Sequence, residues 1–336
     1  MESGSRSIRG SKEEARKMID AVVGIDIGGT TTEFGVVDRK GKCLKANSIN
    51  TRQYTDLEEY LKCMHLEIQN IINSIYKDIN IKGIGVGAPN ANHFRGTIEN
   101  APNLNWKGSV PFVKKLKRYF PGWPVALTND ANAAALGEMF YGGAKNMKDF
   151  VVITLGTGLG SAFVVNGQLV YGHNGLAGEL GHVNVKHNGR LCRCGNRGCL
   201  ETYVSATGIR RTFFNLLRTG SAKSSLSGVG FQKITSEMIY EAAVKKDRLA
   251  LEAFNITGEI LGRKLADVTA ITDPEAIFLL GGLAQAGNLI FNPTRNAMEK
   301  NLFPIFRGKI KILPSKLKRD SAAVLGAAAL AWQNRD

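Results

Sequence analysis

Two segments of the chain, about 128 residues apart, share one pattern in which a Gly/Thr-rich turn joins two apolar strands. The first reads VVGIDIGGTTTEFGVV from Val22 to Val37, and the second reads VVITLGTGLGSAFVV from Val151 to Val165. Strand, turn and strand form a hairpin, whereas the glycine turn of a dinucleotide-binding fold must open a helix. The pattern therefore excludes a Rossmann fold and favours two similar halves over two unrelated apolar hairpins.

Both turns carry groups that suit phosphate. Backbone N–H groups in a Gly/Thr turn can cradle a phosphate, and threonine hydroxyls add further donors. The first copy has a carboxylate, Asp26, where the second has Thr154, and a carboxylate beside phosphates suits a hydrated magnesium ion. Each motif alone could be an ordinary turn, but two turns facing one cleft could hold a polyphosphate from both sides. The sequence contains no G-x-x-x-x-G-K-[ST] loop.

The glycine-rich segment 174–201 holds three of the five cysteines. It supplies one imidazole and three thiols in the pattern H-x9-C-x-C-x4-C, namely His182, Cys192, Cys194 and Cys199. This is a complete tetrahedral set for zinc, and four protein ligands leave no open position for a reacting water. We therefore expect a structural zinc rather than a catalytic one; three free cysteines in a surface loop are the alternative.

Two acidic residues at element junctions are candidates for chemistry. In the segment TNDANAAALGE, Asn129 or Asp130 can cap an alanine-rich helix. The sharper interpretation places the Asp130 carboxylate at a strand–helix junction, aimed into a cleft. Glu179 and Glu201 lie at the two ends of the zinc segment.

Composition limits the class of protein. The chain has 336 residues, enough for one large or two medium domains, and its 43% hydrophobic content is that of a globular protein. The formal charge is +15, with basic residues concentrated in 186–223 and 300–319. Such a surplus of positive charge is typical of a protein that binds nucleic acid or an anionic substrate such as a nucleotide, and also of an ordinary solvated basic surface. With no apolar run of 18 residues, no signal-like start and few cysteines, we expect a cytoplasmic protein.

Periodicity predicts an alternation of strands and helices. A capping box at Ser11 predicts a short helix through Ile19, and Asn166-Gly167 predicts a hairpin turn. Residues 218–230 read as a linker or flap. Helices are expected at 56–77, 107–119, after 129, and at 205–217, 235–244, 248–270, 288–302 and 322–332; strands are expected at 22–27, 33–38, 81–86, 125–127, 276–280 and 310–313.

Six motifs follow one another in a specific order. They are DIGGT at 26–30, NDANAAALGE at 129–138, TLGTGLGSA at 154–162, ELGH at 179–182, CRCGNRGCLE at 192–201 and LLGG at 279–282. In this order and at these spacings, the sequence from Ala21 to Trp332 resembles the ROK family of bacterial sugar kinases and sugar-responsive repressors, within the actin and hexokinase superfamily. No single motif would identify the family.

The resemblance implies an α/β fold with two actin-like (ribonuclease H-like) domains around a central cleft and a zinc-stapled loop. We expect a flexible arm at 1–20, a small domain at 21–128 completed by a C-terminal helix at 322–336, and a large domain at 129–321 containing the zinc loop 174–201. The family resemblance also implies a homodimer.

The implied reaction is ATP-dependent phosphorylation of a hexose, with Mg²⁺ as cofactor and a structural Zn²⁺. Asp130 matches the family's catalytic base. The expected sugar-binding residues are Asn103, Asn129, Asp130, Glu179, His182 and Glu201. The expected nucleotide, phosphate and magnesium positions are Asp26, Gly28, Gly29, Thr30, Gly156, Thr157, Gly158, Gly281 and Gly282. The expected zinc ligands are His182, Cys192, Cys194 and Cys199, and His182 is expected to contact both zinc and sugar.

Glucose is the first expectation for the sugar, because APNLNW at 101–106, ELGH and CLE resemble family glucokinases. Fructose, N-acetylmannosamine, N-acetylglucosamine and allose remain alternatives. Many family members have Lys after DIGGT, where this chain has Thr31, and the difference could alter the choice of phosphoryl donor.

Two other classes of protein are considered. A repressor of this family carries an N-terminal helix-turn-helix domain, and only about 20 residues precede the first strand here, so we do not expect nucleic acid as a partner. Actin-like chaperone ATPases lack the zinc loop.

Overall fold

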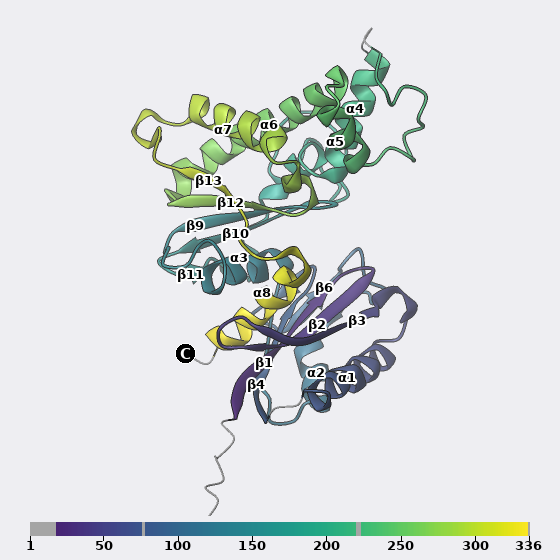
Figure 1. Cartoon of the computed structure of the whole chain (residues 1–336), viewed down its shortest axis with the longest axis vertical. Coiled ribbons are helices and arrows are strands. Elements are labelled where there is room, and N and C mark those ends of the chain that lie inside the picture. The colour runs from purple at the N-terminus through teal and green to yellow at the C-terminus, as the bar shows by residue number, and fades with distance from the viewer. Residues whose placement is uncertain (1–17, 76–77, 220–222, 335–336) are drawn as a thin grey trace, which may run out of the picture.

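The computed structural model describes residues 18–75, 78–219 and 223–334. It is built on two five-stranded sheets with the same strand arrangement (Figure 1). In each sheet three strands form an antiparallel meander, and two further strands add in parallel beyond its first strand. The shared topology confirms the internal repeat predicted from the two hairpins.

The first sheet has the order β3-β2-β1-β4-β8, and the second has the order β11-β10-β9-β12-β13. The strands of the first sheet are β1 (Ile19–Ile27), β2 (Thr31–Asp38), β3 (Cys43–Asn50), β4 (Ile79–Gly87) and β8 (Val125–Thr128). Those of the second are β9 (Phe150–Leu155), β10 (Leu159–Val165), β11 (Gln168–Leu169), β12 (Ala276–Leu280) and β13 (Lys311–Pro314). The turns between β1 and β2 and between β9 and β10 are the two Gly/Thr turns.

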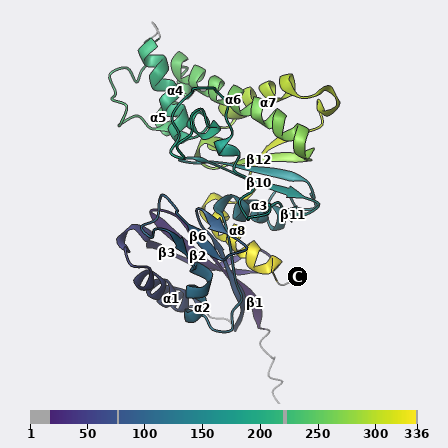
Figure 2. The ribbon, with the colours of Figure 1, turned by 180° about the vertical axis from the view of Figure 1, so that it is seen from behind.

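Helices cover both faces of each sheet (Figures 1 and 2). On the first sheet, α1 (Leu57–Asn73) and α2 (Phe112–Tyr119) cover one face. On the second, α4 (Ala206–Thr219), α5 (Ser236–Val244), α6 (Arg248–Thr272) and α7 (Asn288–Asn301) cover the outer face. The strands alternate accordingly, so that Val151 and Ile153 face the outer core while Phe150 and Val152 face the inner one.

The remaining two helices pack between the sheets. The first, α3 (Asp130–Phe140), follows the last strand of the first sheet but packs on the second sheet, where Ala135 and Leu136 meet Phe150. Conversely, α8 (Arg319–Gln333) follows the last strand of the second sheet but packs on the first, where Val324 meets Val22. The two helices also contact each other (Figure 1). Each half of the chain therefore covers the sheet of the other half.

This exchange depends on close approach between α8 and the first sheet. A Cβ on Gly24 in β1 would lie 2.2 Å from the Val324 carbonyl oxygen, and one on Gly85 in β4 would lie 1.9 Å from the Ala327 carbonyl oxygen. Real Cβ atoms do not come so close to backbone oxygens, so a side chain at either position would push α8 away from the sheet. The two glycines and the alanines of α8 thus set the distance between helix and sheet.

Several element boundaries differ from those predicted. The helix predicted at 107–119 begins only at Phe112, because Pro111 precedes it and Ser109–Val110 pair as strand β7. This strand belongs to a small sheet of order β5-β6-β7, with β5 at Ala91–Asn92 and β6 at Thr97–Glu99, that was not predicted.

Further predicted elements fall partly on residues that the structure does not describe. The end of the helix predicted to follow Ser11 is wrong, since Met18 is not helical and Ile19 is the first residue of β1, which also ends the predicted arm early. Residues 1–17 lie outside the described residues. The helix predicted at 56–77 ends at Asn73 in α1. Residues 76–77 of that prediction, and residues 220–222 of the predicted linker, lie outside the described residues.

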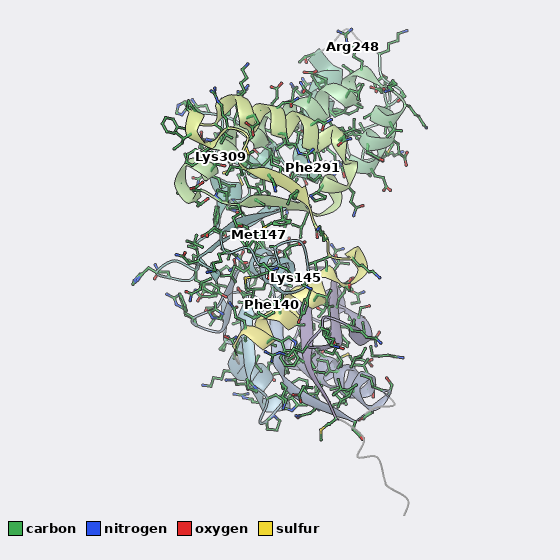
Figure 3. All side chains as sticks on the ribbon, turned by 60° about the vertical axis from the view of Figure 1, so that its left-hand side comes forward. Phe140, Lys145, Met147, Arg248, Phe291 and Lys309 are labelled. Atoms are coloured by element: carbon green, nitrogen blue, oxygen red, sulfur yellow. The ribbon has the colours of Figure 1, made fainter. Side chains whose placement is uncertain are left out.

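Phe140 ends α3, and Lys145 and Met147 lie just beyond it at the level between the two sheets (Figure 3).

No helix in the described part of the chain is both long and apolar enough to cross a bilayer. The division into domains at 128/129 and 321/322 stays a prediction.

Replacing Gly85 by Ala tests the packing of α8. We expect the free energy of unfolding to fall by about 3 kcal/mol, because the new methyl group must displace the α8 backbone. Urea denaturation followed by circular dichroism measures this loss. Gly230→Ala is the control, since nothing lies within 4 Å of its added Cβ; equal stability of both variants would contradict the packing argument.

Candidate active site

Asp26 lies near the end of β1, where the strand pairs with β2 on one side and β4 on the other. Its side chain is half-buried. Burial raises the pKa of Asp26 to about 7, and the negative charges of Asp130 and Glu33 add to the rise. A carboxylate so crowded by protein and by other acids favours a proton or a cation beside it.

Asp130 is the first residue of α3, directly after β8. The helix cap is Asn129, whose Oδ1 accepts the Asn132 N–H at 2.7 Å, so Asp130 is not the capping residue. One Asp130 oxygen accepts the N–H of Ala131 at 2.8 Å. Solvent reaches the Asp130 side chain, yet the protein surrounding it raises its pKa. A solvent-accessible carboxylate deep among protein atoms is the arrangement predicted for a cleft.

Gly87 brings these two carboxylates together. It is the last residue of β4, where it pairs with Asp26 of β1 on one side and with Thr128 of β8 on the other. A Cβ on Gly87 would lie 3.3 Å from Asp26 Oδ1 and 4.0 Å from the Asp130 Cα. The absence of a side chain at Gly87 therefore keeps the space between the two acids open. Sequence analysis missed this residue, although a strand that ends in Gly-Ala-Pro was visible.

The second Gly/Thr turn reaches the same place from the other sheet. The Thr154 hydroxyl accepts the N–H of Gly160 at 3.2 Å, and a Cβ on Gly160 would lie 3.2 Å from the Ala131 methyl group. The start of α3 therefore rests on the hairpin of β9 and β10. The exchange of helices between the sheets thus places Ala131, the neighbour of Asp130, against β10 just beyond the second turn.

The backbone of the second turn is hydrogen-bonded to the start of α4 on one side and has free space beside it on another. Gly156 O accepts the Ala206 N–H of α4 at 2.9 Å, and Thr157 O accepts the Thr207 hydroxyl at 3.1 Å. Gly281 has φ +91°, and a Cβ there would lie 2.6 Å from the Leu155 carbonyl oxygen, so glycine is required where β12 ends. Cβ atoms on Gly156 and Gly282 would meet nothing within 4 Å, which leaves open backbone beside the strand ends.

The first turn contacts the loop between β6 and β7 of the small sheet. Its Gly28 N–H donates to the Thr31 carbonyl at 3.0 Å, and the side chains of Thr30 and Thr31 are exposed. A Cβ on Gly29 would lie 2.7 Å from both the Cβ and the carbonyl oxygen of Asn103. The structure therefore puts Asn103 against the first Gly/Thr turn.

Two short 3-10 helices carry the acids of segment 174–201 toward Asp130. The first, η2, spans Leu180–His182 after Glu179, and the second, η3, spans Leu200–Thr202. Burial raises the pKa of Glu179; His182 opposes the rise, while the charges of Asp130 and Glu201 add to it. His182 Nε2 lies 3.9 Å from Glu179 Oε2. The three acids and the imidazole thus occupy one site.

Glu201 connects this site to the second turn. A Cβ on Gly158 would lie 2.8 Å from Glu201 Oε2, and the other oxygen, Oε1, accepts the Cys192 thiol at 3.1 Å. One carboxylate therefore contacts the Gly/Thr turn on one side and the cysteine cluster on the other.

The four predicted zinc ligands form a cluster. Their ligand atoms all lie within 4.8 Å of one another, with Cys192 Sγ 3.7 Å from His182 Nδ1 and Cys194 Sγ 3.6 Å from Cys199 Sγ. Sulfurs 2.3 Å from a tetrahedral zinc would be about 3.8 Å apart. The cluster is therefore compatible with a zinc site. His182 presents Nδ1 to the sulfurs and Nε2 to the acids.

Comparison with known proteins follows this geometry. A model of the ROK family matches residues 22–334. The chain belongs to the ROK family.

A glucokinase from Thermotoga maritima is 34% identical over 315 residues, which cover 92% of this chain and 96% of that protein. Among solved structures, a ROK family glucokinase from Streptomyces griseus in complex with glucose and AMPPNP is 32% identical with a TM-score of 0.76, covering 93% of this chain and 99% of that one. A ROK family transcriptional regulator, a homolog of the E. coli MLC protein, is 27% identical with a TM-score of 0.83, covering 94% and 78%. The family therefore contains relatives of both kinds.

The structure of this ROK protein gathers the predicted residues into two groups. The charge of Asp130 contributes to the raised pKa of both Asp26 and Glu179, and the charge of Glu201 contributes to that of Glu179. Asn103 adjoins the first turn at Gly29. The roles assigned to all of these positions stay predictions.

The cysteine cluster yields a prediction about metal content. We expect about one zinc per chain in the purified protein, and at least a tenfold loss of bound zinc in Cys194→Ser, because three ligands hold the ion far less tightly than four. Elemental analysis by mass spectrometry measures the ratio. Cys63→Ser, on α1 and outside the cluster, is the matched control. A folded wild-type protein without zinc would refute the site.

The raised pKa of Asp26 yields a prediction about pH. An unfolded Asp has a pKa of about 3.9, so between this value and about 7 the folded state binds more protons than the unfolded state. Stability from this group is therefore lost as pH rises through this range, by about 2–3 kcal/mol between pH 5 and 8. Asp26→Asn should gain that amount relative to wild type over the same interval.

The measurement is urea denaturation at several pH values without magnesium or nucleotide. Asp38→Asn, at the other end of the same hairpin, is the control, because an asparagine oxygen can still accept the N–H groups of Lys40 and Lys42 that Asp38 accepts. A difference between Asp26→Asn and wild type that does not change with pH would contradict the burial argument.

Proposed function

We propose that the protein is an ATP-dependent hexose kinase that converts glucose to glucose 6-phosphate. The observation that carries the proposal is the position of Asp130. This solvent-accessible carboxylate lies at the start of α3, across Gly87 from Asp26, and the next residue, Ala131, faces Gly160 just beyond the second Gly/Thr turn. Similarity to glucokinases over nearly the whole of both chains supports the same function.

Asp130 is the proposed general base. Its pKa is raised by burial, which moves a carboxyl group toward the range where it can take a proton efficiently near neutral pH. In the reaction a sugar hydroxyl gives its proton to Asp130 while the hydroxyl oxygen bonds to the γ-phosphorus of ATP. The bond from that phosphorus to the β–γ bridging oxygen breaks, and ADP leaves with the electron pair.

The two Gly/Thr turns are the proposed phosphate-binding elements. Gly28, Gly29 and Thr30 approach from the first sheet, and Gly156, Thr157 and Gly158 approach from the second. Asp26 is the proposed partner of a hydrated Mg²⁺, which neutralises phosphate charge when bound; the crowding that raises the pKa of Asp26 favours a cation beside it. Gly281 and Gly282 offer open backbone to the nucleoside.

The proposed sugar site faces Asp130 from the zinc segment. Glu179 and Glu201 can accept hydroxyl protons, and His182 presents Nε2 to the same side. Asn129 uses its oxygen as the cap of α3, so its amide nitrogen is the donor available to a sugar hydroxyl. Asn103 is the weaker candidate, because it lies against Gly29. Cys192, Cys194, Cys199 and His182 Nδ1 would hold the structural zinc that fixes this wall.

Fructose, N-acetylmannosamine, N-acetylglucosamine and allose are the alternative sugars, since they have the same kinds of hydroxyl as glucose. Thr31 is exposed, and many relatives have Lys at this position. The phosphoryl donor is therefore a second property, besides the sugar, in which this protein can differ from those relatives.

A sugar-responsive regulator is the second candidate, favoured by the structural similarity to a ROK transcriptional regulator. Such a protein would bind the sugar without turning over ATP. A homodimer and a cytoplasmic location are further proposals that rest on the family resemblance.

An ADP-release assay across a panel of hexoses tests the proposal. We expect glucose to stimulate ATP turnover most, and Asp130→Asn to lower kcat by roughly 10²- to 10⁴-fold, the usual contribution of a general base. The wild-type rate should also fall as the pH drops and Asp130 becomes protonated.

Asp267→Asn, an exposed position on α6, is the matched control and should keep the wild-type rate. If no hexose stimulates ADP release while glucose still binds, the regulator is the better assignment. Near wild-type rates in Asp130→Asn would refute the proposed base.

A further inference from the structure

A second cavity lies on the large half of the molecule, outside the candidate active site. Its volume is about 630 Å³, within the range of small-molecule sites. Segment 186–190 of the zinc loop forms one side, and α4 forms the other. Four cationic side chains line it: Lys186, Arg190, Arg211 and Arg218. All four come from the basic segment 186–223, and the proposed kinase reaction gives none of these four side chains a role.

Arg190 is held rigidly at this cavity by uncharged partners. Its guanidinium donates to the Thr202 carbonyl at 2.8 Å, the Gly208 carbonyl at 3.1 Å and the Thr212 hydroxyl at 3.0 Å. It also lies over the Tyr203 ring, 4.4 Å from its centroid. These contacts fix the position of the charge without neutralising it.

None of the four cations pairs with a carboxylate in the described part of the chain, and no acidic residue lines the cavity. The contact found for Arg211 is again to a carbonyl, that of Leu191, at 3.4 Å. Like charges gathered around one concavity repel one another and attract anions. A phosphate group, with several acceptor oxygens, matches arginines held in this way.

The rest of the cavity wall suits an organic ligand. Phe214 and Phe231 line it, with ring centroids 5.2 Å apart, and the Tyr203 ring adjoins Arg190. Aromatic side chains beside fixed cations are typical of sites that take both a charged group and a carbon skeleton. A cavity of about 630 Å³ has the size of a site for a small molecule.

We propose that this cavity binds a small phosphate-bearing molecule, with Lys186, Arg190, Arg211 and Arg218 holding the phosphate. The site shares no residue with the proposed catalytic machinery and does not depend on the proposed kinase activity. Arg190 does, however, donate to the carbonyl of Thr202, the residue after Glu201, so both sites draw on the same loop.

Isothermal titration calorimetry on the full zinc-loaded chain tests the proposal. Inorganic phosphate and glucose 6-phosphate are the two probes, titrated separately without nucleotide. The variant is Arg211→Gln combined with Arg218→Gln; it leaves Arg190 and its structural bonds intact. We expect a binding component in the wild type that weakens at least tenfold in this variant.

Arg307→Gln combined with Lys309→Gln removes the same charge from the connection between α7 and β13, at the opposite end of this half from α4 (Figure 1). This control should bind both probes as the wild type does. If only one probe shows the sensitive component, the cavity is supported and its ligand is assigned to free phosphate or to the ester. No binding, or equal weakening in both variants, would overturn the proposal.

Discussion

The exchange of α3 and α8 between the two sheets is the constraint on which the rest of the structure depends. Each helix follows one sheet and packs on the other, and the two meet between them. Backbone contact at Gly24 and Gly85 leaves α8 little freedom to move on the first sheet. Because α3 begins at Asp130, the same exchange that joins the halves also places the proposed base where both Gly/Thr turns arrive. Stability and the site are therefore set by one packing arrangement.

The cost of this arrangement is electrostatic. Burial is the main cause of the raised pKa of Asp26, Asp130 and Glu179, and neighbouring acids add to the rise for Asp26 and Glu179. A fold selected only for stability would not gather acids in this way, since replacing any of them would relieve repulsion. Groups that arrive from outside, such as a magnesium ion or sugar hydroxyls, can offset the repulsion. The unfavourable charge is thus itself an argument that the site binds ligands.

Most of the fold and part of the site could be predicted from the sequence, because they depend on local pattern. The hairpin of Gly28 to Thr30, its repeat at Gly156 to Gly158 and the cysteine spacing are all short-range signals. The role of Gly87 could not be predicted, since it depends on parallel pairing between strands far apart in sequence. The exchange of α3 between sheets and the small sheet of β5, β6 and β7 depend likewise on long-range packing. Charge counting found the basic segment, but only the fold shows that its cations line one cavity.

The zinc segment is the clearest case in which local and long-range effects combine. It is rich in glycine and has only two short 3-10 helices, so it cannot hold a fixed shape through regular secondary structure alone. The cysteine cluster links its two ends, and the Arg190 bonds tie its middle to α4. His182 and Glu201 of this segment belong to the candidate active site, while its Lys186 and Arg190 line the cationic cavity. One cross-linked loop therefore contributes residues to both places.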